Sequence, residues 1–434
     1  MTDPSVAPAR RRVVVTGWGM ITPLGPDTVT SWEGLQEGRS GIGPITQVAA
    51  DDLPVKIAGE VKGFDPGSYL PYKVVRRTDP YARYALVATQ EALKHAKFTI
   101  DESNAHRVGI LIGSGYGPMS SVSDHTRTLD ARGPRAVSPL AAVTGSIDSA
   151  PGEISIATGA TGPSRATSSA CASGTDAIGE AARWIRSGAS EVVITGGAED
   201  IITRLDIAGS GNAKALTARG GDPTEASRPF DADRGGFVMA AGAGILVLES
   251  EEHALARGAH ILAEILGYAA SSDAYHMTAP HPEGTSMRRA MTEALRDAGI
   301  GPDGVDYVNA HGTGTELNDP TELAALRAVL GERVEQIPIS STKSMTGHMI
   351  GAAGAVEAIV GGLVINHGVV PPTINCHAPI DSSVNFVAHT AQRHHVDTVM
   401  SNSFGFGGHN AVLVLRRWAP FPHEKNTDGR KSWT

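Results

Sequence analysis

Short apolar runs alternate with amphipathic segments along most of the chain. Runs of about four or five residues rich in Val and Ile are typical of buried strands, whereas apolar positions three or four residues apart are typical of helices. This alternation predicts an α/β protein with a largely buried sheet. We expect strands at residues 13–16, 108–112, 154–157, 191–195, 244–248, 307–310, 337–340, 398–401 and 411–415.

Capping residues mark where two of the helices begin and end. Asp79 and the proline after it predict the N-cap and first turn of a helix that ends near Lys97. Asp319, again followed by proline, and Glu322 give the same signal for a second helix, which Gly331 ends. Local sequence therefore predicts the limits of both helices.

Two parts of the chain repeat one plan. Cys171 precedes a helix of small residues over 173–187, and His348 precedes a similar helix over 351–367. Each helix ends at a glycine, and each part of the chain then continues into two strands. The repetition predicts a fold built from two related halves.

Composition narrows the class of protein. Of the 434 residues, 41% are apolar and 19% are charged, which predicts a globular protein with a large core. Asp and Glu (46) outnumber Lys and Arg (37), and a net charge of −9 argues against general nucleic-acid binding. The 51 glycines, with only 5% aromatic residues, indicate tight turns and close backbone contacts.

The sequence lacks a membrane span, a secretory signal and a set of cysteines, and these three features bear on where the protein is located and whether it binds a metal. The longest apolar run, over 237–248, is shorter than the roughly 20 residues of a membrane span, so no membrane association is expected. No secretory signal is recognised near the first residue. The only cysteines, Cys171 and Cys376, exclude a disulfide scaffold and a Cys-rich zinc module. We therefore expect a cytoplasmic protein that holds no metal.

Cys171 is the candidate nucleophile. It lies in SSACASG (168–174), directly before a helix, where free backbone N–H groups and the helix dipole favour a thiolate, so a lowered pKa is expected. On local sequence alone, a buried structural cysteine explains it equally well. Cys376 has no helix behind it and is interpreted as structural.

Two histidines favour the nucleophile interpretation. His311 follows a strand in NAHGTGT (309–315), and α/β proteins place functional residues at such strand ends. His348 lies between a strand and a glycine-rich helix start in STKSMTGH (341–348). Each alone is better explained by a structural role, but together with Cys171 they predict a nucleophile with proton donors or oxyanion binders.

A glycine-phenylalanine loop, SFGFGGHN (403–410), precedes the last strand. Such a loop offers backbone N–H groups to an oxyanion while its aromatic ring controls access, although a tight hairpin is an equal alternative. The glycine clusters at 17–19, 113–117 and 312–314 complete no nucleotide-binding pattern.

In combination, these motifs resemble those of the β-ketoacyl-acyl-carrier-protein synthases of the elongating type, over about residues 12–418. The resemblance is carried by SACASG (169–174), SSDAYHMTAP (271–280), NAHGTGT, STKSMTGH and NSFGFGG (402–408), in the order Cys–His–His. It implies an α/β, thiolase-like fold in which two pseudo-duplicated βαβαβαββ halves form a layered αβαβα core. The expected parts are residues 1–255, residues 256–418 and a polar tail at 419–434.

The resemblance also implies a decarboxylative Claisen condensation that needs no bound cofactor. Cys171 would take an acyl chain from acyl carrier protein as a thioester. His311 and His348, as neutral imidazoles, would bind the thioester carbonyl of malonyl-carrier protein. Lys343, paired with Glu357, would organise the two histidines.

Further positions match residues that contact substrate in the family. The backbone N–H of Phe406, with that of the nucleophile, would bind the tetrahedral oxyanion, and Phe406 with Phe404 would gate the acyl pocket. Thr313 and Thr315 match hydroxyls of the phosphopantetheine tunnel, and Thr278 is assigned to substrate binding.

An acidic carrier protein needs a local basic patch on a chain of net charge −9. Basic residues match positions near the tunnel mouth of the family, although solvated surface charges are the alternative for each: Lys73, Arg76, Arg77, Arg135 and Lys214.

Three positions depart from the family pattern. Tyr116 replaces a common aliphatic residue at the acyl pocket, and Ala141 replaces a bulky aromatic that reaches in from the dimer partner. Ala241 replaces the usual acidic residue. The first two changes leave the length and shape of the acyl chain open.

Two pathways also stay open. One is fatty-acid synthesis by a homodimer; the other is type II polyketide or polyene synthesis by a heterodimer with a chain-length-factor homologue that lacks the cysteine. A non-catalytic chain-length factor is disfavoured because Cys171, His311 and His348 are all present. A coenzyme-A-dependent thiolase is disfavoured because the loop 404–410 contains no second cysteine.

Overall fold

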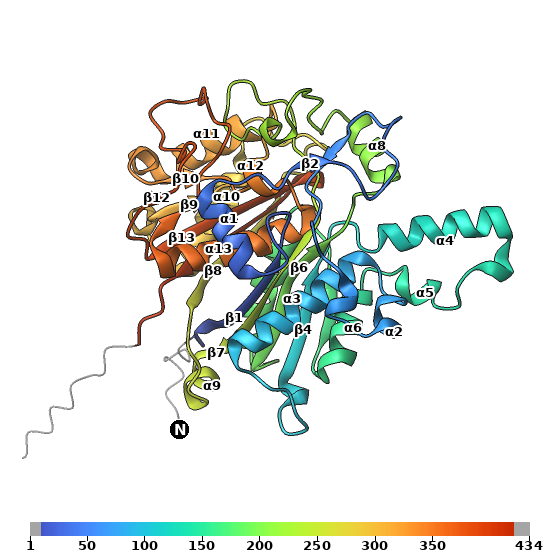
Figure 1. The fold of residues 1–434 in the computed structure, drawn as a ribbon. Coiled ribbons are helices and arrows are strands. Elements are labelled where there is room, and N and C mark those ends of the chain that lie inside the picture. The colour runs from blue at the N-terminus through green and yellow to red at the C-terminus, as the bar shows by residue number, and fades with distance from the viewer. Residues whose placement is uncertain (1–9, 421–434) are drawn as a thin grey trace, which may run out of the picture.

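A ten-stranded sheet runs through the centre of the molecule in the computed structural model, which describes residues 10–420 (Figure 1). The strand order is β10-β9-β13-β14-β8-β1-β7-β6-β4-β5. In chain order the strands are β1 (Val13–Ile21), β4 (Val108–Gly113), β5 (Ser164–Thr167), β6 (Val192–Glu199), β7 (Gly242–Ser250), β8 (Ala263–Ser272), β9 (Tyr307–Asn309), β10 (Ile339–Ser340), β13 (Thr398–Gly405) and β14 (His409–Arg416).

The sheet divides into two repeats of five strands. The order β5-β4-β6-β7-β1 in the first repeat corresponds position by position to β10-β9-β13-β14-β8 in the second. The repeats join where β1 pairs with β8, through Val14 opposite Glu264 and Val15 opposite Ala263. The predicted duplication is therefore confirmed at the level of strand order.

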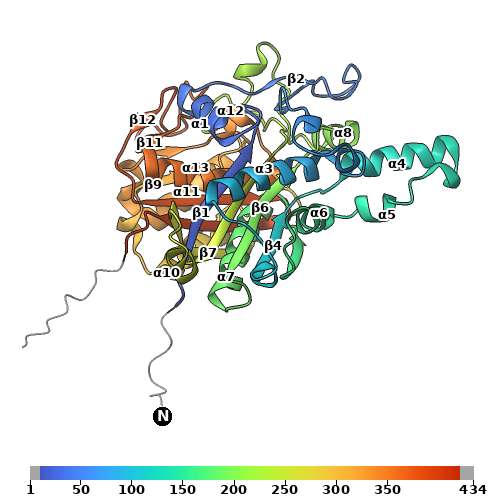
Figure 2. The ribbon, with the colours of Figure 1, turned by 60° about the horizontal axis from the view of Figure 1, so that its bottom comes forward.

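Helices complete five layers (Figures 1 and 2). Two helices cover the outer face of each repeat, and two lie between the repeats and contact strands of both. The outer helices are α3 (Pro80–Ala96) and α6 (Ser149–Thr158), then α10 (Thr285–Ala298) and α11 (Asn318–Leu330), and the central pair is α7 (Ser173–Arg186) and α13 (Ala353–His367). This is the layered αβαβα arrangement predicted from the sequence.

The remaining elements are short or lie at the surface. They are α1 (Thr28–Glu37), α2 (Tyr72–Val75), α4 (Met119–Arg132), α5 (Ala141–Thr144), α8 (Arg204–Asn212), α9 (Glu251–Ala256), α12 (Lys343–Thr346), β2 (Gly43–Pro44), β3 (Ile57–Ala58), β11 (Val369–Val370), β12 (Gln392–Arg393) and the short 3₁₀ helices η1 (Pro66–Ser68), η2 (Ala105–Arg107), η3 (Pro134–Ala136), η4 (Pro223–Glu225), η5 (Pro302–Gly304), η6 (Gly331–Glu335), η7 (Ile350–Ala352) and η8 (Phe406–Gly408).

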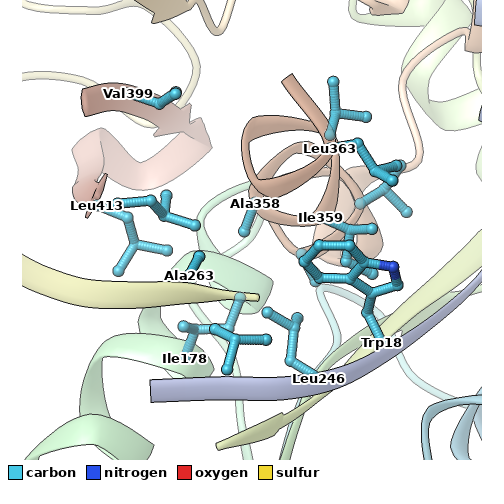
Figure 3. Close-up of a cluster of buried hydrophobic side chains, with 14 of the residues drawn as sticks. Trp18, Ile178, Leu246, Ala263, Ala358, Ile359, Leu363, Val399 and Leu413 are labelled. Atoms are coloured by element: carbon cyan, nitrogen blue, oxygen red, sulfur yellow. The ribbon is translucent and has the colours of Figure 1, made fainter. Parts of the chain in front are cut away.

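Among the helices of ten or more residues that the structure describes, the central helix α13 is the most buried. Its side chains pack with those of both repeats, and Figure 3 shows Ala358, Ile359 and Leu363 of α13 among residues such as Trp18 and Leu413. The segment Ile350–His367 is long and apolar enough to cross a membrane, but 89% of it is buried inside the protein. Its apolar character is therefore explained by its place in the core.

The structure corrects several expected elements. Residues 154–157, expected as a strand, lie within α6, because a short apolar run does not distinguish a strand from a helix. Two strands of the ten-stranded sheet were not expected: β5, a polar strand at the edge of the sheet, and β8, which carries glycine and alanine in place of the usual branched residues. The polar tail was expected from residue 419, and 421–434 lie outside the described residues.

Helix capping was predicted correctly at one of the two helices. Asp79 caps α3 by accepting a hydrogen bond from the N–H of Tyr81, and Lys97 ends the helix. At α11, Gly331 ends the helix as expected, but Leu317 stands at the N-cap position and no side chain caps it. The carboxylates of Asp319 and Glu322 are used elsewhere, as described below.

Candidate active site

Cys171 lies in a tight turn between β5 and α7, with its side chain buried. The turn places Ala170 at a φ of 52°, a backbone conformation that is uncommon for a residue with a side chain. Ser173 holds the turn: its hydroxyl donates to the carbonyl of Ala170 and accepts from the N–H of Ser169. The turn thus holds the sulfur at the start of α7.

Both histidines come from the second repeat and meet Cys171 in one place. The Sγ atom of Cys171 and one ring nitrogen each of His311 and His348 lie within 4.8 Å of one another. The two imidazoles are 5.3 Å apart between centroids and nearly perpendicular. The two repeats approach closely here, since a Cβ atom on Gly174 of α7 would lie only 2.7 Å from the carbonyl oxygen of Gly351.

The loop that carries His311 is held by two buried carboxylates. Glu322 accepts hydrogen bonds of 2.8 Å from the N–H groups of His311 and Gly312. Asp319 accepts from the N–H groups of Gly314 and Phe230. The sequence signal at these two residues was assigned to helix capping, which is wrong, because their oxygens satisfy loop N–H groups from other segments of the chain. They were therefore missed as site residues.

Lys343 and Glu357 form a fully buried ion pair beside the histidines, with 2.5 Å between Nζ and Oε1. Burial raises the pKa of Glu357 to about 7. Burial, and secondarily the charge of Lys343, hold the pKa values of His311 and His348 well below their usual range. Both imidazoles are therefore neutral at neutral pH, and each can donate one N–H.

Burial also raises the pKa of Cys171 to about 11. The backbone N–H of Phe406 and the charge of Lys343 act in the opposite direction but offset only part of this effect. The lowered pKa expected from the helix N-terminus is therefore wrong: loss of solvent around the sulfur outweighs the helix dipole. At neutral pH Cys171 is therefore a thiol, which must lose its proton before it can act as a nucleophile.

This protonation state predicts how alkylation of Cys171 depends on pH. Below a pKa of about 11, the thiolate fraction rises tenfold with each pH unit. We expect the second-order rate of inactivation by iodoacetamide to rise by about tenfold per unit from pH 7 to pH 9, followed by mass spectrometry of the Cys171 peptide. A rate that levels off below pH 8 would instead show a stable thiolate and contradict the assigned protonation state.

The glycine-phenylalanine loop closes over the sulfur. The backbone N–H groups of Phe406 and Cys171 both act on Sγ and lower its pKa, so two donors lie near the place where a Cys171 thioester would form. The Phe406 ring is half-buried and lies edge-to-face with Phe237, 6.4 Å away, whereas Phe404 is buried 5.9 Å from His311. Phe406 is thus the more exposed of the two rings.

A cavity of about 540 Å³ reaches from these residues to the surface. Cys171 and both histidines line its inner end. Among the other predicted site residues, it is lined by Thr278, Thr313, Thr315, Phe404, Phe406 and Lys214. Sequence reasoning missed Pro54, Val55 and Met287, which also line it and gave no signal, because their apolar side chains look like ordinary core.

Other predicted site residues lie outside this cavity. Tyr116 follows β4 and is 41% exposed, and its N–H donates to Glu199. Glu199, which was not predicted, also accepts from the N–H groups of Gly115 and Gly351, and burial raises its pKa to about 7. It therefore joins the segment of Tyr116 to the start of η7 and α13.

The predicted docking residues differ in surroundings. Lys214 lies at the cavity, whereas Lys73, Arg76 and Arg135 are exposed elsewhere on the surface. Arg77 forms a two-pronged ion pair with Glu153, at 2.7 and 2.9 Å. Their role in carrier-protein binding stays a prediction.

Ala141 and Ala241 are the other two positions at which the sequence departs from the family pattern. Ala141 begins α5, on an arm that projects from the body of the molecule (Figure 1). Ala241 is fully buried and its N–H donates to Gly59. Nothing in the structure explains the loss of an acidic side chain at Ala241.

The cluster formed by Cys171, His311 and His348 also bears on metal binding. The sequence argument against a metal was the small number of cysteines, but the fold brings the donor atoms of Cys171, His311 and His348 within 4.8 Å of one another. A structural zinc site needs four protein ligands, and among the described residues this group supplies three, one of them a protonated thiol. The absence of a metal stays a prediction.

Comparisons with known proteins agree on one family. Two sequence models of this family match the chain. They are "Beta-ketoacyl synthase, N-terminal domain" over residues 10–254 and "Beta-ketoacyl synthase, C-terminal domain" over residues 262–377. The chain is 46% identical over 410 residues to 3-oxoacyl-[acyl-carrier-protein] synthase 2 of Synechocystis sp., covering 94% of this chain and 99% of that relative.

Two solved structures are closely similar. The ishigamide ketosynthase/chain length factor has a TM-score of 0.88 and 37% identity, over 95% of this chain and 100% of that one. A ketosynthase bound to a hexaketide, in complex with its type II polyketide acyl-carrier protein, has a TM-score of 0.86 and 33% identity, over 94% of this chain and 100% of that one.

Proposed function

The chain belongs to the β-ketoacyl synthase family and is a condensing enzyme, and we propose that Cys171, His311 and His348 carry its reaction on substrates bound to acyl carrier protein. The observation that carries this assignment is one thiol and two neutral imidazoles at the inner end of a cavity that reaches the surface. We further propose a cytoplasmic enzyme without a bound cofactor.

The first half-reaction loads the enzyme. Both ring nitrogens of His348 are buried without a hydrogen-bond partner among the described residues, so this imidazole can take the Cys171 proton. The sulfur attacks the acyl thioester carbonyl, and the N–H groups of Cys171 and Phe406 bind the oxyanion. The carrier thiolate leaves and takes the proton from His348, so the acyl chain is transferred without net charge change.

The second half-reaction forms the new carbon–carbon bond. The malonyl carboxylate leaves as carbon dioxide, and its bonding electrons pass to the thioester oxygen as an enolate, which accepts N–H bonds from His311 and His348. Two neutral donors suit this step because a cation in so buried a site is costly. The enolate carbon attacks the Cys171 thioester, and the expelled Cys171 thiolate takes up the one proton that the overall reaction consumes.

The carrier-protein docking surface is proposed at the cavity mouth. Lys214 lies there. Lys73, Arg76 and Arg135 are exposed but do not line the cavity, so their part in docking rests on the family resemblance alone. The relatives whose names specify acyl-carrier protein support this partner. Arg77 is a weaker candidate because Glu153 already pairs with it.

We also propose that the projecting arm packs against a second subunit. No residue of α4 is buried, and four apolar side chains of the arm are exposed: Val122, Leu129, Leu140 and Val143. A stable monomer rarely exposes apolar residues so close together. The second subunit is another copy of this chain, for fatty-acid synthesis, or a chain-length-factor homologue, for polyketide or polyene synthesis. The name of one similar structure includes such a factor.

The test is elongation with defined carrier proteins. Purified enzyme, alone and with candidate chain-length factors, is incubated with acyl-carrier proteins of graded length and malonyl-carrier protein. We expect an acyl group on Cys171, release of carbon dioxide, and a product longer by two carbons, all followed by mass spectrometry. Elongation by the enzyme alone indicates a homodimer, whereas elongation only with the factor indicates a heterodimer.

The variant Lys214→Glu tests carrier-protein docking separately from the reactivity of Cys171. It reverses one charge at the cavity mouth without touching Cys171, so the KM for malonyl-carrier protein is expected to rise while the iodoacetamide rate is unchanged. Absence of carbon dioxide release under every condition would overturn the proposed function. A thiolase is disfavoured further because the other cysteine, Cys376, is buried and does not line the cavity.

A further inference from the structure

Asp176 lies in the first turn of α7, shortly after Cys171, and takes no part in the reaction described above. One of its carboxylate oxygens accepts a hydrogen bond of 2.5 Å from the hydroxyl of Ser169, and the other accepts one of 2.7 Å from the hydroxyl of Tyr268. Ser169 belongs to the turn that carries Cys171, whereas Tyr268 belongs to β8 of the second repeat. The carboxylate therefore links the nucleophile turn to a strand of the other repeat.

Tyr268 is the fixed end of this link. Its side chain is 4% exposed, and a Cβ atom on Gly179 would lie 2.2 Å from its ring, so the ring rests directly against the backbone of α7. The guanidinium of Arg183 lies over the ring, and the Tyr268 N–H donates to the Asp297 side chain at 2.9 Å. Burial and the charge of Asp176 raise the pKa of Tyr268, so its hydroxyl keeps its proton and acts as a donor.

Ser169 is the other end of the link, and it lies beside the proposed oxyanion donors. A Cβ atom on Gly405 would lie 3.1 Å from the carbonyl oxygen of Ser169 and 3.0 Å from the backbone nitrogen of Cys171. The nucleophile turn is thus in close contact with the loop that supplies the N–H group of Phe406. A shift of Ser169 therefore changes the position of the Cys171 N–H group relative to that of Phe406.

The nucleophile turn needs contacts that hold it, because its backbone conformation is unfavourable. Ala170 has a φ of 52°, and such a conformation persists in a residue with a side chain only where the surrounding structure supports it. Ser173 supports the turn from α7, through its bonds with the N–H of Ser169 and the carbonyl of Ala170. Asp176 adds a support from β8, through the Tyr268 hydroxyl.

We propose that Asp176 is a positioning residue that holds the Cys171 N–H group in place to bind the oxyanion of acyl transfer, with Tyr268 as its anchor. This inference rests on the proposed roles of Cys171 and of the two histidines. The histidines lie on other segments of the chain, and the link makes no hydrogen bond to either of them. The link therefore acts on acyl transfer to the sulfur and not on decarboxylation.

The test measures acylation of Cys171 by acyl-carrier protein in single turnovers, followed by mass spectrometry. Asp176→Ala removes both bonds, so we expect acylation to slow by at least about tenfold, because a misplaced oxyanion donor loses much of its effect. Asp176→Asn should stay within about threefold of the unchanged enzyme, because an amide accepts from one hydroxyl and donates to the other. Glu180→Ala is the matched control: this carboxylate of α7 accepts from Arg183, and its removal should leave acylation unchanged.

Two further measurements separate positioning from a general loss of structure. In the Cys171→Ser background, adding Asp176→Ala should leave carbon dioxide release from malonyl-carrier protein unchanged. Ser169→Ala and Tyr268→Phe each cut the link at one end, so the double variant should acylate no more slowly than the slower single variant.

Four results would each overturn the inference: acylation of Asp176→Ala at the normal rate, an Asp176→Asn variant as slow as Asp176→Ala, an equal loss of carbon dioxide release, or a double variant slowed by the product of the two single effects. In contrast, an unchanged enzyme that is never acylated on Cys171 would overturn the proposed function, and this inference with it.

Discussion

Replacing Cys171 with serine is expected to abolish acylation of the enzyme and to reduce condensation by at least about 10³-fold. The Cys171 thiol already has a pKa raised to about 11 by burial, and a serine hydroxyl in the same place loses its proton far less readily. The neutral imidazoles of His311 and His348 are too weakly basic to compensate. Mass spectrometry after incubation with acyl-carrier protein measures the loss directly.

The same variant separates the two half-reactions. The histidines proposed to bind the enolate are unchanged in Cys171→Ser, so release of carbon dioxide from malonyl-carrier protein should persist without product formation. Cys376→Ser is the matched control, because that thiol is buried outside the catalytic cavity, and it should leave acylation intact. Retained acylation in Cys171→Ser would remove this residue from its assigned role.

Replacing Lys343 with methionine is expected to cost about 3–5 kcal/mol of folding free energy. The change leaves the Glu357 carboxylate in the core without its cation. The carboxylate then takes up a proton in the folded state at a pH where the unfolded chain has lost it. The unfolded chain therefore binds fewer protons, and stability falls as pH rises from about 4.5 through the raised folded-state pKa of Glu357. Urea unfolding at pH 6 and pH 8 measures the difference.

The paired variant Lys343→Met with Glu357→Met tests whether the unpaired Glu357 carboxylate causes the loss of stability. Two apolar side chains remove the stranded charge, so most of the lost stability should return. Activity should not return, because the paired variant still lacks the Lys343 charge that lies beside both histidines and is proposed to organise them. Equal stability of the single and paired variants, or a single variant that is more stable at pH 8 than at pH 6, would contradict the account.

The sequence predicted that Cys171, His311 and His348 act together, and the fold brings them within 4.8 Å of one another, but their electrostatics were not predicted. Cys171 and His348 precede helices of small residues, and His311 follows a strand, so each lies at a turn that local sequence could identify. The pKa of Cys171 was predicted in the wrong direction, because the helix dipole is visible in the sequence whereas burial of the sulfur is not.

Segments without a strong local pattern were predicted least well. The strand β5 is polar because it lies at the edge of the sheet, and residues 154–157 are apolar although they are helical. Asp319 and Glu322 look like helix-start residues, and only the neighbouring His311 loop shows what their oxygens bind. In each case the deciding contact is made with a residue that is distant in sequence.

By itself, the sequence determined the two repeated halves, most of the strands and helices, and the residues able to do thioester chemistry, because these depend on hydrophobic periodicity and on residue type over short spans. Only the tertiary structure decided that a thiol from one half faces two neutral imidazoles from the other, and that Tyr268 of the second half bonds to Asp176 of the first. Distances between halves and loss of solvent around a side chain arise from packing of the complete chain, which no local stretch encodes.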